Sequence, residues 1–78
     1  MKAEQSLDCM GLYCPMPIVK TAAIIKKMSV GEVLEVVADD IGIKPDIAAW
    51  CKVTGHELLE IEDGDSGEIK VYVKKTHD

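Results

Sequence analysis

Cys14 is the residue of this chain that we expect to be chemically reactive. Pro15 and Pro17 follow it, and an apolar helical pattern then covers residues 18–28. Pro17 suits the first turn of a helix, where its missing N–H would have had no partner. A helix start presents unpaired backbone N–H groups and about half a positive charge. We therefore expect a helix beginning about one turn beyond Cys14 to favour its thiolate, which is the nucleophilic form of cysteine.

The other two cysteines lie in different surroundings. Cys51 follows Trp50 in an apolar helical pattern, so we expect a structural thiol whose pKa is raised by burial. Cys9 closes the first expected strand, where it either points into the core or pairs with Cys14 as a dithiol if the loop folds back. A zinc site from the cysteines and His56 would lack any Cys-x-x-Cys or His-x-x-x-His spacing, so we expect no bound metal.

The residues around Cys14 resemble the TusA/SirA family of small sulfur carriers. Residues 50–59 are similar to that family's passage from the second helix into the third strand. The resemblance implies a two-layer α/β sandwich in the order βαβαββ, with Cys14 carrying sulfur as a persulfide and with no cofactor. The matching positions of the first motif, which would form the cysteine and its supporting loop and helix start, are Asp8, Gly11, Leu12, Cys14, Pro15 and Pro17.

This chain departs from the family pattern in two places. Many members have a basic residue where Met10 stands, and many have Asp-Pro where residues 40–42 read Asp-Ile-Gly. A basic side chain beside the thiol could recognise an anion, so the first departure bears on the identity of the sulfur donor or acceptor. Neither departure touches Cys14.

Composition narrows the remaining functions. A chain of 78 residues is expected to form a single domain, residues 1–78, and the absence of phenylalanine predicts an aliphatic core. The net charge of −5 and the lack of arginine argue against direct binding to nucleic acid. We see no signal-like apolar start and no run of about 20 apolar residues, which predicts a cytoplasmic protein without membrane segments. An odd number of cysteines in such a chain predicts free thiols.

Hydrophobic periodicity predicts two helices and the last three strands, while the first strand rests mainly on the family resemblance. The two helices are then expected to pack on one face of a four-stranded mixed sheet, with the other face left for solvent or a partner. A right-handed crossover makes the first two strands parallel, and the turn at residues 63–67 makes the last two a hairpin. The expected strands are residues 2–8, 33–38, 57–62 and 69–73, and the expected helices are residues 18–28 and 45–54.

Alternation and position give finer expectations for the second half of the chain. Leu59 and Ile61 should point inward on the third strand, while Glu60 and Glu62 face Lys70 and Lys74 across the hairpin. After the second helix, His56 is expected to hydrogen-bond the helix end. His77 is expected to fray with the terminus.

The resemblance implies a carrier that receives sulfur from a cysteine desulfurase or a rhodanese-like donor protein. It would pass the sulfur to an acceptor protein in tRNA thiolation, molybdenum-cofactor synthesis or sulfur oxidation. Such a protein is a persulfide sulfurtransferase or carrier more than a stand-alone enzyme, and we expect a monomer. Two alternatives stay open: a thiol redox protein that uses Cys9 and Cys14, and a regulatory interaction domain in which Cys14 only packs.

Overall fold

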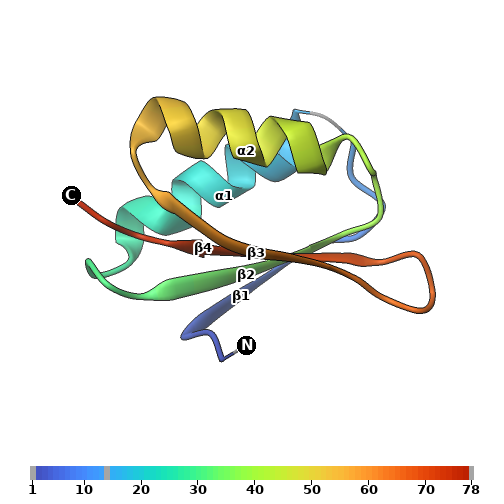
Figure 1. The fold of residues 1–78 in the computed structure, drawn as a ribbon, viewed down its shortest axis with the longest axis horizontal. Coiled ribbons are helices and arrows are strands. Elements are labelled where there is room, and N and C mark those ends of the chain that lie inside the picture. The colour runs from blue at the N-terminus through green and yellow to red at the C-terminus, as the bar shows by residue number, and fades with distance from the viewer. Residues whose placement is uncertain (1, 14, 78) are drawn as a thin grey trace.

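The computed structural model describes residues 2–13 and 15–77, and Figure 1 shows its two layers. Within these residues, neither helix is long and apolar enough to cross a membrane. The order βαβαββ confirms the predicted fold class. The elements are β1 (Gln5–Cys9), α1 (Met16–Lys27), β2 (Val33–Ala38), α2 (Ile43–Thr54), β3 (Glu57–Asp63) and β4 (Ile69–Lys74).

The strands form a mixed sheet in the order β1-β2-β4-β3, and both helices cover the same face of it (Figure 1). β1 and β2 run parallel, while β4 is antiparallel to both β2 and β3. Cys9 and Ala38 are paired at the ends of the two parallel strands. The loops that follow β1 and β2 therefore leave the sheet at the same edge, beside the N-terminal ends of the two helices.

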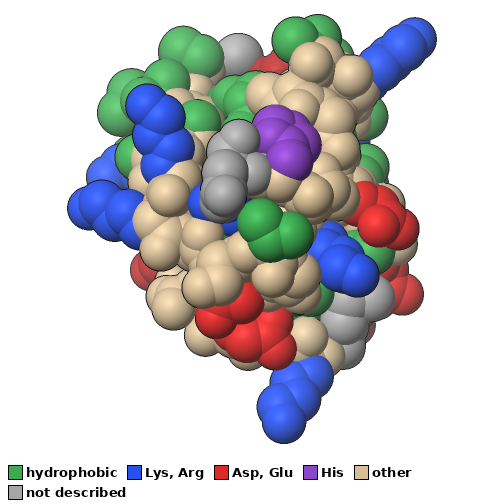
Figure 2. Space-filling model, turned by 90° about the vertical axis from the view of Figure 1, so that its left-hand side faces the viewer, with side chains coloured by type: hydrophobic (Ala, Val, Ile, Leu, Met, Phe, Trp, Pro, Cys, Tyr) green, Lys and Arg blue, Asp and Glu red, His purple; other side chains and the backbone are tan. Residues whose placement is uncertain are grey.

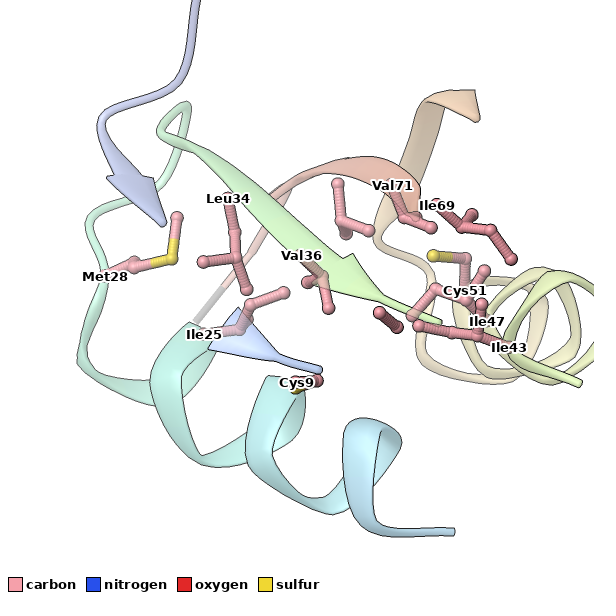
Figure 3. Packing of buried hydrophobic residues seen from close by; sticks show 12 residues of the cluster. Cys9, Ile25, Met28, Leu34, Val36, Ile43, Ile47, Cys51, Ile69 and Val71 are labelled. Atoms are coloured by element: carbon pink, nitrogen blue, oxygen red, sulfur yellow. The ribbon is translucent and has the colours of Figure 1, made fainter. Parts of the chain in front are cut away.

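The core between the layers is aliphatic, as predicted. Figure 3 shows side chains of β2 and β4 meeting those of both helices. Alternate residues of β2 and β4 point toward the helices, which is the period of a pleated strand. The buried apolar residues of the two central strands are Leu34, Val36, Ala38, Ile69, Val71 and Val73.

Both helices begin two residues earlier than predicted. In α1, Pro17 lies in the first turn, as predicted, but the helix starts at Met16, one residue ahead of it. In α2, the carbonyl of Asp40 accepts the N–H of Ile43 at 3.0 Å, which starts the helix ahead of Pro45. The first strand is Gln5–Cys9 rather than residues 2–8, because its pairing with β2 begins at Gln5.

The predicted inward side chains of β3 were half right. Leu58 and Ile61 pack against the core, and Leu59 does not. The pairing of β3 with β4 shifts between Leu58 and Glu60, and such a bulge reverses the alternation of side chains along the strand. Strict alternation assumes a strand without a bulge. Starting from Ile61, it therefore predicts that Leu59 points inward, whereas the bulge places Leu58 there.

The charged pairs of the hairpin follow from the same shift. Glu62 lies opposite Lys70, as predicted, whereas Glu60 lies opposite Tyr72 and Lys74 lies opposite Glu57. The bulge moves every pair on its far side by one position. The predicted pairing is therefore correct near the turn and wrong toward the start of β3.

The sheet face away from the helices is partly closed by its own side chains. Tyr72 points to this face but is only 3% exposed. Its hydroxyl donates to a carboxylate oxygen of Glu35 at 2.8 Å, and Ser6 donates to the other oxygen at 3.1 Å. The bond to Glu35, together with burial and the nearby acidic charges, raises the pKa of Tyr72 to about 12.

Candidate functional site

The loop after β1 is a tight, hydrogen-bonded turn. A carboxylate oxygen of Asp8 accepts the N–H of Met10 at 2.9 Å, and Leu12 N–H donates to the carbonyl of Cys9 at 3.1 Å. Gly11 has φ +79°, a backbone conformation that side chains with a Cβ rarely adopt. Leu12 then packs its side chain against the core. Asp8, Gly11 and Leu12 thus set the course of the chain from β1 toward α1.

A second loop buttresses the first. Gly11 N–H donates to a carboxylate oxygen of Asp39 at 3.1 Å, which joins the loop after β1 to the loop after β2. Asp40 accepts the N–H of Gly42 at 3.0 Å just before α2. The adjacent carboxylates of Asp39 and Asp40 therefore each accept a backbone N–H group. Among the described residues, no three His, Cys, Asp or Glu side chains are grouped to hold a metal ion.

The start of α1 pairs its own N–H groups. Pro15 occupies the N-cap position, and its carbonyl accepts the N–H groups of Ile18 and Val19, each at 3.1 Å. Met16 N–H donates to the carbonyl of Tyr13 at 2.8 Å. These short-range bonds join Tyr13 and Pro15 to the first turn of α1.

The expectation that the start of α1 presents unpaired N–H donors was therefore wrong. The three N–H groups of this turn are paired within the chain, and Pro17, which is buried, has none. The helix dipole still gives the start of α1 a partial positive charge, and no acidic side chain in the first turn opposes it.

Cys14 itself lies outside the described residues. Its neighbours Tyr13 and Pro15 are described, and both take part in the bonds of the helix start. The structure thus brings the supporting residues Asp8, Gly11, Leu12, Pro15 and Pro17 together as one loop and helix start, without testing the role of the cysteine.

Cys9 is fully buried, with 0% of its surface exposed. Burial raises the pKa of the Cys9 thiol; Lys20 opposes this effect and Asp8 adds to it. Of the two orientations that the sequence left open, the side chain has the one that points into the core, where Figure 3 shows it beside α1. A buried thiol kept in its neutral form is a poor nucleophile.

Cys51 is a structural thiol, as predicted. It is 5% exposed, and Figure 3 places it beside Ile43 and Ile47 of α2. Burial alone raises the pKa of Cys51 to about 11. Two of the three thiols are therefore shielded and held in the neutral form.

A cavity at the opposite end of the molecule was missed by the sequence analysis. It has a volume of about 430 Å³ and lies at the C-terminal ends of the two helices, the end that faces the viewer in Figure 2. The signal available in the sequence was a tryptophan close to a histidine at a helix end. The other residues that line the cavity come from distant segments of the chain. The lining residues are Ala22, Ile25, Lys26, Trp50, Thr54, His56, Lys75 and His77.

Both histidines have ring contacts that differ from those predicted for them. The His77 ring, through Nε2, lies 2.6 Å from the carbonyl oxygen of Thr54 at the end of α2, so His77 rather than His56 bonds the helix end. His56 instead accepts the backbone N–H of Thr76 at Nδ1, at 3.2 Å. Thr76 also donates its hydroxyl to the carbonyl of Gly55 at 2.8 Å. The expectation that His77 frays was wrong because these bonds fasten Thr76 and His77 to residues 54–56 at the end of α2.

Lys75 closes the end of α1. Its side chain is 4% exposed, and Nζ donates to the carbonyls of Met28 at 2.6 Å and Lys26 at 3.3 Å. The last carbonyls of a helix have no partner within it, and an ammonium group there also complements the helix dipole. The charge pattern of the sequence could not show that this lysine is buried, because its partners belong to another element.

Comparison with known proteins identifies the family. The family described as "Sulfurtransferase TusA" matches residues 5–75. The Bacillus subtilis protein named "Putative sulfur carrier protein YrkI" is 46% identical over 96% of this chain and 99% of its own length. The sulfur carrier protein TusA of Allochromatium vinosum is 40% identical over 94% of this chain and 95% of its own. Two further relatives match over only 38% and 36% of their own lengths.

The fold has a solved counterpart. The crystal structure of a SirA-like protein from Desulfitobacterium hafniense superposes with a TM-score of 0.83, covering 94% of this chain and 99% of that one. Sequence identity to it is 20%, so this likeness concerns the fold alone. The βαβαββ sandwich, the loop that precedes α1 and the match over residues 5–75 lead to one assignment. The chain belongs to the TusA family of sulfurtransferases.

Proposed function

We propose that this protein is a sulfur carrier that holds a sulfur atom as a persulfide on Cys14 and relays it between two proteins. The observation that carries the assignment to Cys14 is the burial of the other two thiols. Cys9 and Cys51 are 0% and 5% exposed, and burial raises the pKa of both. Of the three cysteines in the sequence, Cys14 is the one that lies in the Cys-Pro-x-Pro motif, which falls within the matched residues 5–75.

The transfer conserves atoms and electrons without a further reagent. The Cys14 thiolate attacks the outer sulfur of a donor persulfide, R–S–SH. A new bond forms between Cys14 Sγ and that sulfur, and the S–S bond of the donor breaks. The donor leaves as the thiolate R–S⁻, while the proton stays on the transferred sulfur, giving Cys14–S–SH. An acceptor thiolate repeats the exchange in the second half of the relay.

Such an exchange needs a thiolate, a good leaving group and access, so it requires neither a general base nor a cofactor. The part of this chain is to present Cys14 in a defined loop. Asp8, Gly11 and Leu12 shape the approach from β1, while Pro15 and Pro17 begin the helix whose positive dipole end faces the loop.

The proposal extends to partners and state. The donor is a cysteine desulfurase or a rhodanese-like protein, and the acceptor is a second protein with a reactive thiol or activated group. Residues 1–78 act as one domain and as a monomer in the cytoplasm. The protein is thus as much a binding module as an enzyme.

The alternative in which Cys9 and Cys14 alternate between dithiol and disulfide is less well supported. Cys9 is completely buried and its thiol is favoured over its thiolate. Thiol–disulfide exchange would require the end of β1 to leave its pairing with β2.

Mass spectrometry of the protein after a limiting dose of inorganic polysulfide tests the function. We expect a single added sulfur of about 32 Da, located on the peptide that contains Cys14 and removed by mild reductant. Iodoacetamide titration over pH should show one fast thiol below the unperturbed value of about 8.5. No added sulfur, together with an ordinary Cys14 titration, would leave the regulatory-domain reading as the better account.

A further inference from the structure

Large apolar side chains are exposed around the loop that bears Cys14. Tyr13, Met16 and Val19 are spaced three residues apart through the start of α1 and are 74%, 44% and 54% exposed. Met10 follows β1 and Ile41 follows β2, and these are 45% and 75% exposed. Together these five residues form what we call the apolar patch. Two other large hydrophobic residues among those described, Val30 and Val53, are exposed elsewhere.

The fold brings the two parts of the patch to one edge of the sheet. β1 and β2 are parallel, and their last paired residues are Cys9 and Ala38. Met10 follows the first of these directly, and Ile41 lies three positions after the second. The bond from Gly11 N–H to the Asp39 carboxylate, 3.1 Å long, joins the two loops. Both loops lie at the same end of the molecule in Figure 1. Ile41 therefore lies near a loop from which it is about 30 residues distant in sequence.

The patch carries little charge for its size. Residues 9–19 contain no charged side chain at all. The nearest carboxylates, Asp8, Asp39 and Asp40, each accept a backbone N–H of these same loops. Exposed apolar surface of this kind, without a cover in the monomer, marks sites of protein association.

The same residues offer little to a small anionic sulfur donor such as thiosulfate. Lys20, which opposes the rise of the Cys9 pKa, follows these residues, but no lysine or arginine stands among residues 9–19. The first-turn N–H groups of Met16, Ile18 and Val19 are already paired within the chain. An anion site at a helix start uses such groups when they are free. Recognition of the donor therefore falls to apolar contact.

We infer that the apolar patch is the docking surface for the donor protein, and that this donor surrounds its persulfide with an uncharged, apolar face. The inference rests on the proposed function, since the two sulfur atoms must meet at Cys14. The contact excludes water from the exchange and selects a protein donor over small anions. Ile41 is its most informative member because its side chain is exposed and it is remote in sequence from Cys14. Its backbone carbonyl accepts the Lys44 N–H at 3.2 Å, and a substitution of the side chain keeps that carbonyl.

The test compares Ile41→Glu and Ile41→Lys with Val53→Glu and Val53→Lys. Val53 is 86% exposed on α2 and provides the matched control. Each variant is loaded from a cysteine desulfurase charged with labelled cysteine, from a rhodanese charged with labelled thiosulfate, and from inorganic polysulfide. Circular dichroism checks the fold of each variant.

Both Ile41 variants should load at least about tenfold more slowly from a protein donor, because either charge must be buried at the contact without a partner. Both Val53 variants should load like the wild type, and polysulfide should load all five proteins at similar rates. Opposite effects of Glu and Lys would indicate charge steering instead of apolar docking and would overturn the inference.

Other outcomes also decide the matter. Unchanged transfer from protein donors to the Ile41 variants would overturn the inference but leave the carrier function intact. Wild-type loading from polysulfide and from neither protein donor would do the same. A wild type that no donor loads would instead refute the proposed function. A wild-type dimer in sedimentation that Ile41→Glu disperses would assign the patch to a second copy of the chain.

Discussion

The rings of His56 and His77 lie parallel, with their centroids 4.4 Å apart and an interplanar angle of 6°. Trp50 extends the stack, with its ring centroid 5.5 Å from that of His56. The second histidine is separated from the first by the whole β3–β4 hairpin, so the stack fastens the end of the chain to the end of α2. This arrangement makes the junction sensitive to pH.

Stability should fall in mild acid because of His56. Burial, followed by the nearby His77 and Lys75, lowers its pKa from the ordinary value of 6.5. A lowered folded-state pKa means that the unfolded chain binds the proton more readily. The contribution is therefore complete above about pH 6.5 and is lost as the pH falls through that value toward the folded-state pKa. Protonation at Nδ1 would also remove the acceptor of the Thr76 N–H.

The variant His56→Asn checks this assignment. Its side-chain oxygen can accept the Thr76 N–H, and the amide does not titrate. Urea unfolding between pH 5.5 and 7.5 should show a smaller pH slope for this variant than for the wild type. Lys26 and Lys75 also line the cavity. Equal slopes for the two proteins would contradict the role of His56.

Substitution of Cys14 and of Cys9, one at a time, should distinguish the sulfur carrier from the dithiol redox protein. Cys14→Ser should abolish transfer of labelled sulfur from a cysteine desulfurase. Cys9→Ser should keep most of it, because Cys9 is buried and protonated. The measurement is label retained on the protein after gel filtration, with circular dichroism to confirm that both variants fold. Equal loss in the two variants would favour the dithiol pair.

The cysteine variants should also differ in stability. Cys51→Ser places a hydroxyl among Ile43 and Ile47, which should cost about 1 to 3 kcal/mol of unfolding free energy. Cys14→Ser should change it by no more than about 0.5 kcal/mol, because the carrier proposal requires an exposed thiol at this position and exposed substitutions cost little. Chemical denaturation of both variants measures the difference. Greater damage from the Cys14 variant would show that our placement of the two thiols is wrong.

Thr21→Val should stabilise the protein. Thr21 is 0% exposed on α1, and its hydroxyl has no hydrogen-bond partner among the described residues. Valine has nearly the same shape and removes the unsatisfied group, so we expect a gain of about 1 kcal/mol. Thr54→Val is the matched control, since the Thr54 hydroxyl donates to the Trp50 carbonyl at 2.7 Å and its loss should destabilise. A loss of stability in Thr21→Val would show that its hydroxyl is satisfied.

The sequence by itself determined the local features of this protein. Apolar periodicity located both helices and the last three strands, while the family resemblance supported the first strand. Pro17 and Gly55 marked the start of α1 and the end of α2. The motif around Cys14 indicated the family, which the match over residues 5–75 shows. These features depend on neighbours a few residues apart, and their physical causes, such as a fixed φ or a missing N–H, act within one turn.

The tertiary structure alone decided what distant segments do together. It placed the bulge that moves Leu58 inward, the stack of His56 on His77 and the bond from Gly11 to Asp39 that joins the loops after β1 and β2. It also paired the N–H groups at the start of α1 that the sequence analysis had left free. Each depends on strand register or on a contact across elements. A pattern along the chain does not encode these relationships, because any one of them forms only when the two layers close around the core.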